Sequence, residues 1–360
     1  MNPQVSDPFD TAERRQLREL TRRFVQREVL PHLDDWERAG AVPRDLHRAA
    51  ARVGLLGIGF PEAVGGSGGD LVDSVVLNEE LILAGGSSGL AAALFTHGIA
   101  LPHLLEAGDP GLVERYVRPT LAGKLIGALA VTEPDGGSDV AALRTTARRD
   151  GDHYLVNGAK TYITSGVRAD FVTTAVRTGG PGDDGISLLV IDTSTPGFTV
   201  DRQLAKMGWH CSDTASLSFV GVRVPVGNLV GPENSGFRAL MRHFATERLV
   251  LATQAYATAQ RCLDLTVDWC RNRQTFGRPL AGRQLVRHRL AEMATLVDGA
   301  RGYVRQVAAR VAAGEPLVVE VAMAKNIAVA ACDRVVDQAV QLHGGFGCLR
   351  DADVERHYRD

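Results

Sequence analysis

The spacing of apolar residues changes twice along this chain. From residue 11 to about residue 125, apolar side chains recur every three or four positions, as at Leu17, Leu20 and Phe24, and Pro31 interrupts that run. This period is typical of amphipathic helices. After a Gly-rich loop at residues 65–69, further helices are expected at residues 71–83 and 90–107.

The middle of the chain has the pattern of strands. The pairs Asp150-Gly151 and Asn157-Gly158 flank the short run at residues 153–156, which indicates hairpins. Leu217 and Phe219 alternate with serines, as on a half-buried strand. Two further runs, at residues 171–176 and 186–191, are apolar and rich in β-branched residues. Together these runs predict a β domain.

The helical period returns near Gly236 and continues almost to the end, with breaks at Gly277, Pro279 and residues 314–316. Helices on either side of a β region indicate an α+β protein with segregated layers. We therefore expect an N-terminal α-helical domain at residues 1–126, a middle β domain at residues 127–232 and a C-terminal helical bundle at residues 233–360.

Composition narrows the function classes. The 360 residues carry a formal net charge of −2, so no overall field favours nucleic acid or an anionic membrane. The five cysteines form no Cys-x-x-Cys pair and lie beside no His cluster at zinc spacing, so no metal site is expected. Scattered free thiols, a polar N-terminus and the lack of a long apolar stretch predict a cytoplasmic protein with no membrane span.

Four segments carry the chemical information. They read VTEPDGGSDVAALRTTA at residues 131–147, GAKTYITSG at 158–166, RNRQTFGRPL at 271–280 and QLHGGFG at 341–347. The chain contains no phosphate-loop motif, no Gly-x-Gly-x-x-Gly after a strand and no Gly-x-Ser-x-Gly elbow. Any one of the four segments fits an ordinary turn. In this order, and within a helix–β–helix layout, they closely resemble the acyl-CoA dehydrogenase family, over nearly the whole chain.

The resemblance implies FAD as the cofactor. Residues of the first two segments would line the flavin, because glycines let backbone N–H groups approach the ring and hydroxyls hydrogen-bond its carbonyls and N5. Tyr162 stands where many members have a Trp, and its ring can still stack on the flavin. The residues assigned to the flavin in this way are Leu129, Val131, Thr132, Gly137, Ser138, Tyr162 and Thr164.

The last two segments are expected to reach the FAD of a neighbouring subunit, so the resemblance implies a homotetramer. Arg273 would meet the pyrophosphate, for which a guanidinium is well suited. Phe276 and Gln284 would flank the adenosine half. Gln341, Gly344 and Gly345 would approach the pyrophosphate closely.

Glu247 is the expected catalytic base. The long-chain and isovaleryl branches carry their base in a Glu-Arg step on a helix, and here that helix reads HFATERLVLATQAYA. The CSDTA stretch at residues 211–215 also resembles the long-chain branch. Phe244, Val250 and Leu251 lie three or four positions from Glu247, and apolar neighbours raise the pKa of a carboxyl group. Arg248 points about 100° away. The resemblance places Arg248 and Ser138 on the substrate side.

The expected reaction is the FAD-dependent conversion of an acyl-CoA to the trans-2-enoyl-CoA, with hydride transfer to flavin N5 and electron-transferring flavoprotein as acceptor. The sequence ends at Asp360, before the last helix and loop that members usually carry, and that loop holds the alternative base. Ala245 replaces an acidic residue that some members have near the CoA arm. Two alternatives therefore remain open: a dehydrogenase acting on acyl-carrier-protein thioesters, or a non-catalytic flavin-binding homologue.

Overall fold

The structure, a computed structural model, describes residues 7–360. These residues form two compact units. The bundle unit contains the described chain up to Asp34, together with Gly69–Ala91 and Ala245–Asp360, and the sheet unit contains Asp35–Gly68 and Ala92–Phe244. Residues 1–6, on which part of the expectation about the N-terminus rested, lie outside the described chain.

The N-terminal third is helical, as its apolar period predicts, and Pro31 separates the first two helices. The helices are α1 (Ala12–Phe24), α2 (Leu33–Ala39), α3 (Arg44–Arg52), α4 (Leu71–Leu83), α5 (Ser88–Leu94), α6 (His97–Ala100), α7 (Pro102–Ala107), α8 (Pro110–Leu112) and α9 (Arg118–Leu121). In α4 a capping box joins Asp70 and Asp73, which satisfies the first free N–H groups of the helix.

The single helix expected at residues 90–107 is wrong, because three short helices occupy that stretch. Pro102 begins α7, and a proline cannot donate the backbone hydrogen bond that would continue α6. The Thr96 hydroxyl donates to the Ala92 carbonyl at the other break. Among the described residues no single helix is long and apolar enough to cross a membrane. One bent pair, Ser88–Leu94 with His97–Ala107, meets that test by length and composition alone.

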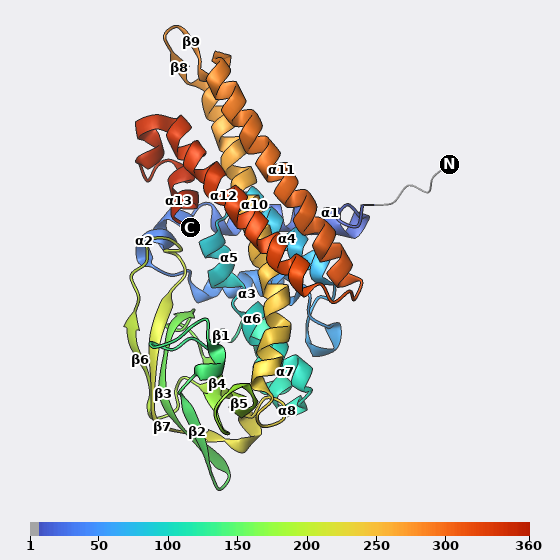
Figure 1. Cartoon of the computed structure of the whole chain (residues 1–360), viewed down its shortest axis with the longest axis vertical. Helices are drawn as coiled ribbons and strands as arrows, with labels where there is room; N and C mark the ends of the chain where they lie inside the picture. Colours follow the sequence, from blue (N-terminus) through green and yellow to red (C-terminus); the bar gives the residue numbers. More distant parts are fainter. Residues whose placement is uncertain (1–6) are drawn as a thin grey trace, which may run out of the picture. The chain divides into compact units, whose positions relative to one another are not determined.

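A seven-stranded sheet fills the middle of the chain (Figure 1). Its strands are β1 (Gly127–Ala130), β2 (Thr146–Asp150), β3 (His153–Thr164), β4 (Phe171–Arg177), β5 (Ile186–Asp192), β6 (Phe198–Gln203) and β7 (Thr214–Pro225). The order is β1-β4-β2-β3-β7-β6, and β5 pairs with β4. The β2–β3 hairpin turns at Asp150-Gly151, where Gly151 has φ +62°.

Asn157-Gly158 forms no hairpin, contrary to the sequence pattern. The pair lies inside β3, where the register against β7 shifts between Val156 and Gly158. Gly158 has φ +150°, and a Cβ there would lie 2.5 Å from Thr145 Oγ1. Only glycine fits this bulge, because the neighbouring backbone approaches so closely.

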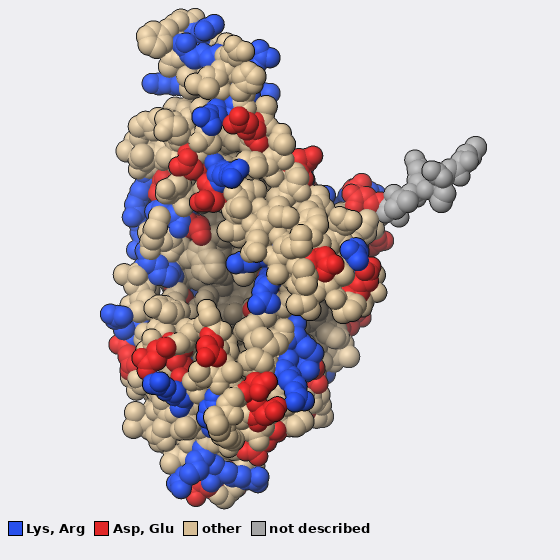
Figure 2. Space-filling model, viewed as in Figure 1, with Lys and Arg blue, Asp and Glu red and all other residues tan. Residues whose placement is uncertain are grey.

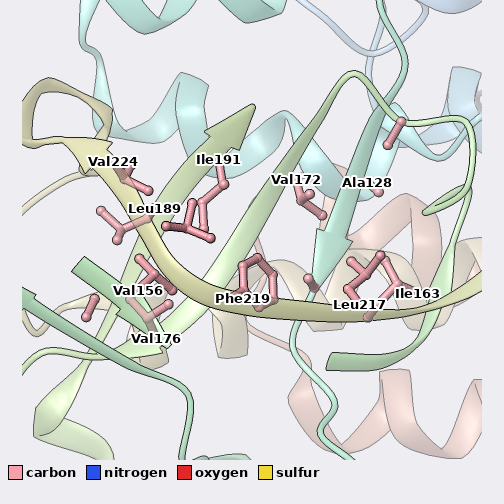
Figure 3. Close-up of a cluster of buried hydrophobic side chains, with 14 of the residues drawn as sticks. Ala128, Val156, Ile163, Val172, Val176, Leu189, Ile191, Leu217, Phe219 and Val224 are labelled. Carbon is pink, nitrogen blue, oxygen red and sulfur yellow. The ribbon is translucent and has the colours of Figure 1, made fainter. Parts of the chain in front are cut away.

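Inward side chains of the strands form the core of the sheet unit (Figure 3). Leu217 and Phe219 are buried, while Ser216 and Ser218 between them are partly exposed, so the alternation predicted for this strand is confirmed. Val156, Leu189 and Ile191 pack in the same cluster. This core fixes the strand ends from which the motif segments project.

Long helices follow the sheet. They are α10 (Gly236–Asn272), α11 (Gln284–Ala312) and α12 (Val318–His343), followed by the short α13 (Asp353–Arg359). A small hairpin of β8 (Gln274–Thr275) and β9 (Arg278–Pro279) joins α10 to α11 and projects from their ends (Figure 1). Within the bundle unit, buried Glu79 of α4 accepts hydrogen bonds from Arg305 Nη2 at 2.6 Å and Tyr256 Oη at 3.0 Å, which ties three helices together.

The surface charges are mixed. Figure 2 shows Lys and Arg interspersed with Asp and Glu across the visible face, in keeping with the net charge of −2. None of the five cysteines, all of which lie in the described chain, forms a disulfide, and Cys211, Cys262 and Cys270 are buried.

Candidate active site

The first motif segment leaves β1 as a tight loop. Glu133 N donates to Gly136 O at 3.0 Å, and Gly136 N donates back to Glu133 O at 3.2 Å. The next two residues, Gly137 and Ser138, are exposed, and their N–H groups donate to no acceptor in the described chain. The hydroxyls of Thr132 and Ser138 likewise have no hydrogen bond to the described residues. The loop therefore presents a row of unused donors.

A buried ion pair lies beneath this loop. Lys160 Nζ is 2.9 Å from Glu133 Oε1, and Lys160 is fully buried. Burial lowers the pKa of Lys160 to about 8, although Glu133 opposes the shift. Burial acts against ionisation of Glu133, but Lys160 and the hydrogen bonds from Thr145 and Arg144 outweigh it and lower its pKa. Sequence reasoning did not single out this pair, since the two residues are far apart in the chain.

The second motif segment is the end of β3. A register shift between Lys160 and Ile163 gives Tyr162 a φ of +60° and turns its side chain outward, with 69% exposed. A positive φ at an aromatic residue is strained and marks a candidate functional position. Thr164 pairs with Thr214 of β7, and its hydroxyl has no hydrogen bond to the described residues. The structure thus brings Tyr162 and Thr164 to one strand end.

The donor set of the sheet unit fits a flavin. Unused hydroxyls and N–H groups match the carbonyl and nitrogen acceptors of an isoalloxazine, and an exposed ring offers a stacking partner. A Cβ at Gly136 would meet no atom within 4 Å, and one at Gly137 would meet only Thr132 Cγ2, at 3.5 Å. A ligand therefore has open access to this backbone. Leu129 of β1 and Val131 just after it are both half-buried.

The last two motif segments meet at one end of the bundle unit. The guanidinium of Arg273 lies 5.8 Å from the ring centre of Trp269, one turn earlier in the chain. Trp269 stacks on Phe346 at 5.0 Å and on His343 at 5.0 Å. Arg273 forms no ion pair with the described residues. Trp269 was missed by sequence reasoning, although an aromatic residue one turn before the motif was a visible signal.

The hairpin between α10 and α11 exposes an aromatic side chain. Phe276, at its tip, has φ +49° and is 97% exposed. Arg283 lies 5.2 Å over its ring and holds the hairpin by donating to the Thr275 carbonyl. Gln284, the first residue of α11, is also exposed. The hairpin thus presents an exposed ring with Arg283 lying over it.

The C-terminal end of α12 is accessible to a ligand. Gln341 is exposed, and Gly344 closes the helix with φ +64°. A Cβ at either Gly344 or Gly345 would meet no atom within 4 Å. Since the Trp269 stack joins this segment to Arg273, an anion bound here would meet a free guanidinium and accessible backbone.

Glu247 lies on α10 within the bundle unit. Its Oε1 is buried and has no hydrogen-bond partner in the described chain. Burial raises the pKa of Glu247 to about 7, although the positive charge of Arg248 acts in the opposite direction. Val250 is half-buried, whereas Leu251 is 40% exposed, so only part of the expected apolar surround is present. A carboxyl group with this pKa is suited to general-base work near neutral pH.

The sequence-derived residues thus form three groups: the β1 loop and β3 end in the sheet unit, and Glu247 and the Trp269 end in the bundle unit. Their assigned roles stay predictions.

Comparison with known proteins covers almost the full chain. The N-terminal, middle and C-terminal domain models of acyl-CoA dehydrogenase match residues 11–124, 128–222 and 234–360. The mitochondrial long-chain specific acyl-CoA dehydrogenase of Rattus norvegicus is 36% identical over 346 residues, which cover 95% of this chain and 80% of that protein.

Solved structures are similar over the same length. A probable acyl-CoA dehydrogenase of Mycobacterium abscessus is 65% identical with a TM-score of 0.97, and the match covers 98% of this chain and 94% of that one. A Mycobacterium smegmatis glutaryl-CoA dehydrogenase in complex with FADH2 is 25% identical with a TM-score of 0.90, covering 99% of this chain and 90% of that one.

Proposed function

The chain belongs to the acyl-CoA dehydrogenase family, and from that premise we propose that Glu247 is the base that removes the α proton of an acyl thioester. The protein is an FAD-dependent oxidoreductase acting on CH–CH bonds. One observation carries the proposal: Glu247 Oε1 is buried without a partner, and burial raises the pKa of this carboxyl group to about 7. Such a carboxylate holds a proton more readily than an exposed one, which suits a weakly acidic substrate.

The chain's own donors and glycines are proposed to hold the cofactor. The hydroxyls of Thr132, Ser138 and Thr164 and the N–H of Gly137 would bind the flavin ring, with Tyr162 stacked on it. When bound, FAD accepts the hydride that leaves the β carbon. Arg248 and Ser138 are proposed to contact the acyl carrier. Two observations support this assignment: the unused hydrogen-bond donors of the loop at residues 131–138, and the outward orientation of the Tyr162 side chain.

Several finer features belong to the same proposal. We infer CoA as the carrier, electron-transferring flavoprotein as the acceptor, a homotetrameric assembly and a cytoplasmic location. The carrier inference rests on the family. An acyl-carrier-protein thioester remains the second candidate, because Ala245 supplies no acidic group near the expected CoA arm.

Anaerobic flavin bleaching tests the function. Purified holoprotein is mixed with acyl-CoAs from short to long, and with matched acyl-carrier-protein thioesters, while the visible flavin absorbance is followed. Bleaching by one acyl-CoA class supports the proposed function and gives the chain length. Bleaching by acyl-carrier-protein thioesters alone would show that the substrate is carried by acyl-carrier protein and not by CoA. A yellow protein that no thioester bleaches would be a non-catalytic homologue.

A further inference from the structure

The loop at residues 131–138 is anchored through its first three residues. Lys160 Nζ donates to Val131 O at 2.9 Å and to Glu133 Oε1 at 2.9 Å. Between these two anchor points, Thr132 O accepts from Thr161 N at 2.9 Å. Consecutive residues of β3 therefore hold consecutive residues of the loop.

The Glu133 carboxylate is held from its other side as well. Thr145 N donates to Glu133 Oε1 at 2.8 Å, and Arg144 N donates to Oε2 at 2.6 Å. Both carboxylate oxygens are thus fixed, and the side chain joins the loop to the start of β2. Nearer the tip, Asp135 has only an exposed ion pair with Arg144 at 3.3 Å, and the N–H groups of Gly137 and Ser138 have no acceptor in the described chain.

Stability alone does not account for a charge pair in this place. Replacing a buried ion pair with apolar residues of similar volume is often neutral or stabilising, because both charges must be removed from water. Such a pair does fix geometry, since both partners require particular positions. Lys160 also begins the bulge that turns Tyr162 outward, so one side chain links both segments that face the expected flavin.

We propose that Glu133 and Lys160 form a buried clamp that positions the 131–138 loop for FAD, with Lys160 as a positioning residue. The clamp rests on the proposed function in one respect, namely that this loop contacts the flavin. It predicts that loss of the Lys160 ammonium displaces Thr132, Gly137 and Ser138 from the cofactor.

The test compares FAD binding with apoprotein stability. Apoproteins of wild type, Lys160→Met and the double variant Glu133→Gln/Lys160→Met are titrated with FAD by fluorescence quenching, and the visible spectrum of each complex is recorded. The loss of two hydrogen bonds from a charged donor is expected to raise the FAD dissociation constant by about tenfold or more. The double variant leaves no uncompensated charge, so it carries the test if Lys160→Met does not fold.

Asn228→Ala is the matched structural control. Asn228 is buried in the same unit, where its Nδ2 donates to Val190 O at 2.8 Å, and it lies outside the clamp. This variant is expected to lower the apoprotein melting temperature while leaving FAD affinity and the flavin spectrum unchanged. The clamp is refuted if the Lys160 variants bind FAD as wild type does, or if Asn228→Ala weakens FAD binding equally.

The titration separates this inference from the proposed function. Binding of FAD by the wild type is measured directly, without substrate. If the wild type binds FAD but thioesters do not reduce the bound flavin, the proposed function is wrong. The effect of the Lys160 variants on FAD affinity would still test the clamp.

Discussion

At the residue scale, the environment of Glu247 lowers the stability of the fold but raises the basicity of the carboxylate. Glu247 Oε1 is buried without a hydrogen-bond partner in the described chain, which is destabilising when the carboxyl group is ionised. The same environment makes it a stronger base than an exposed glutamate. Perturbed carboxyl groups of this kind occur more often at functional sites than elsewhere. Two measurable consequences follow, one for catalysis and one for stability.

Glu247→Gln is expected to slow anaerobic flavin reduction by a good acyl-CoA by at least about 10²-fold, because the amide keeps the shape but accepts no proton. FAD content and thioester binding should be retained. Stopped-flow absorbance of the flavin is the measurement. Glu292→Gln, at an exposed glutamate of α11, is the control and should react as wild type does. Equal reduction rates in Glu247→Gln and wild type would show that the proton leaves by another route.

The pH dependence of stability provides a second test of Glu247. Its pKa is raised from 4.5 to about 7 in the folded chain, so the folded state binds more protons than the unfolded state between those values. Stability from this group is therefore lost as pH rises through about 7. Glu247→Gln lacks that loss, and its stability relative to wild type should increase by about 1–3 kcal/mol between pH 5 and pH 8. Apoprotein melting at both pH values measures it. A pH-independent difference would mean that Glu247 is not perturbed.

At the element scale, β3 contains both features that the sequence predicts correctly and features that it does not predict. Apolar alternation and the Asp150-Gly151 turn predict strands and one hairpin correctly, because both depend on neighbouring residues. Asn157-Gly158 has the composition of a second hairpin, yet it forms a bulge because Thr145, the residue just before β2, lies against it. The clamp between Glu133 and Lys160 escaped sequence reasoning for the same reason. Contacts between distant residues decide both features, and local patterns do not encode them.

Gly158→Ala tests the bulge. The residue has φ +150°, and the added methyl group would lie 2.5 Å from Thr145 Oγ1, so the backbone or Thr145 must shift. We expect a loss of about 1–3 kcal/mol in the free energy of unfolding, measured by denaturant melting of the apoprotein. Gly302→Ala on α11 is the contrasting variant, because a Cβ there meets no atom within 4 Å. Helix propensity predicts a gain of about 0.5–1 kcal/mol for it. Equal effects would contradict the assigned geometry.

At the scale of the whole molecule, the compact units do not follow sequence order. Helices of the N-terminal third divide between the bundle unit and the sheet unit. The spacing of apolar residues identifies a helix but not the core against which it packs, so the three sequence ranges stay a prediction about domains. Exposed apolar side chains add a further feature. Val319, Met323 and Ile327 recur every four residues on α12, which places them in one stripe on the helix surface.

Assembly is the prediction that belongs to this scale. Phe276 is almost fully exposed at a hairpin tip, Arg273 forms no ion pair with the described residues, and the α12 stripe is apolar. Isolated exposed apolar residues are ordinary, but several in one stripe along a helix indicate an interface. A second copy of the chain is the partner that the family implies. We therefore expect a homotetramer by light scattering, in which Arg273 and Phe276 complete the FAD site of a neighbouring subunit.

Arg273→Ala and Phe276→Ala should lose FAD more readily than wild type, because each removes a contact that the subunit bearing the rest of the site cannot supply. The FAD-to-protein ratio after gel filtration measures this loss, and light scattering on the same fractions shows whether assembly persists. Arg289→Ala, at a partly exposed arginine of α11 outside the motif, should retain wild-type FAD content. Loss of a positive charge alone would lower the FAD content of both arginine variants. Only a shared site predicts that Arg273→Ala loses FAD while Arg289→Ala retains it. A wild-type monomer that holds stoichiometric FAD would contradict both the assembly and the shared site.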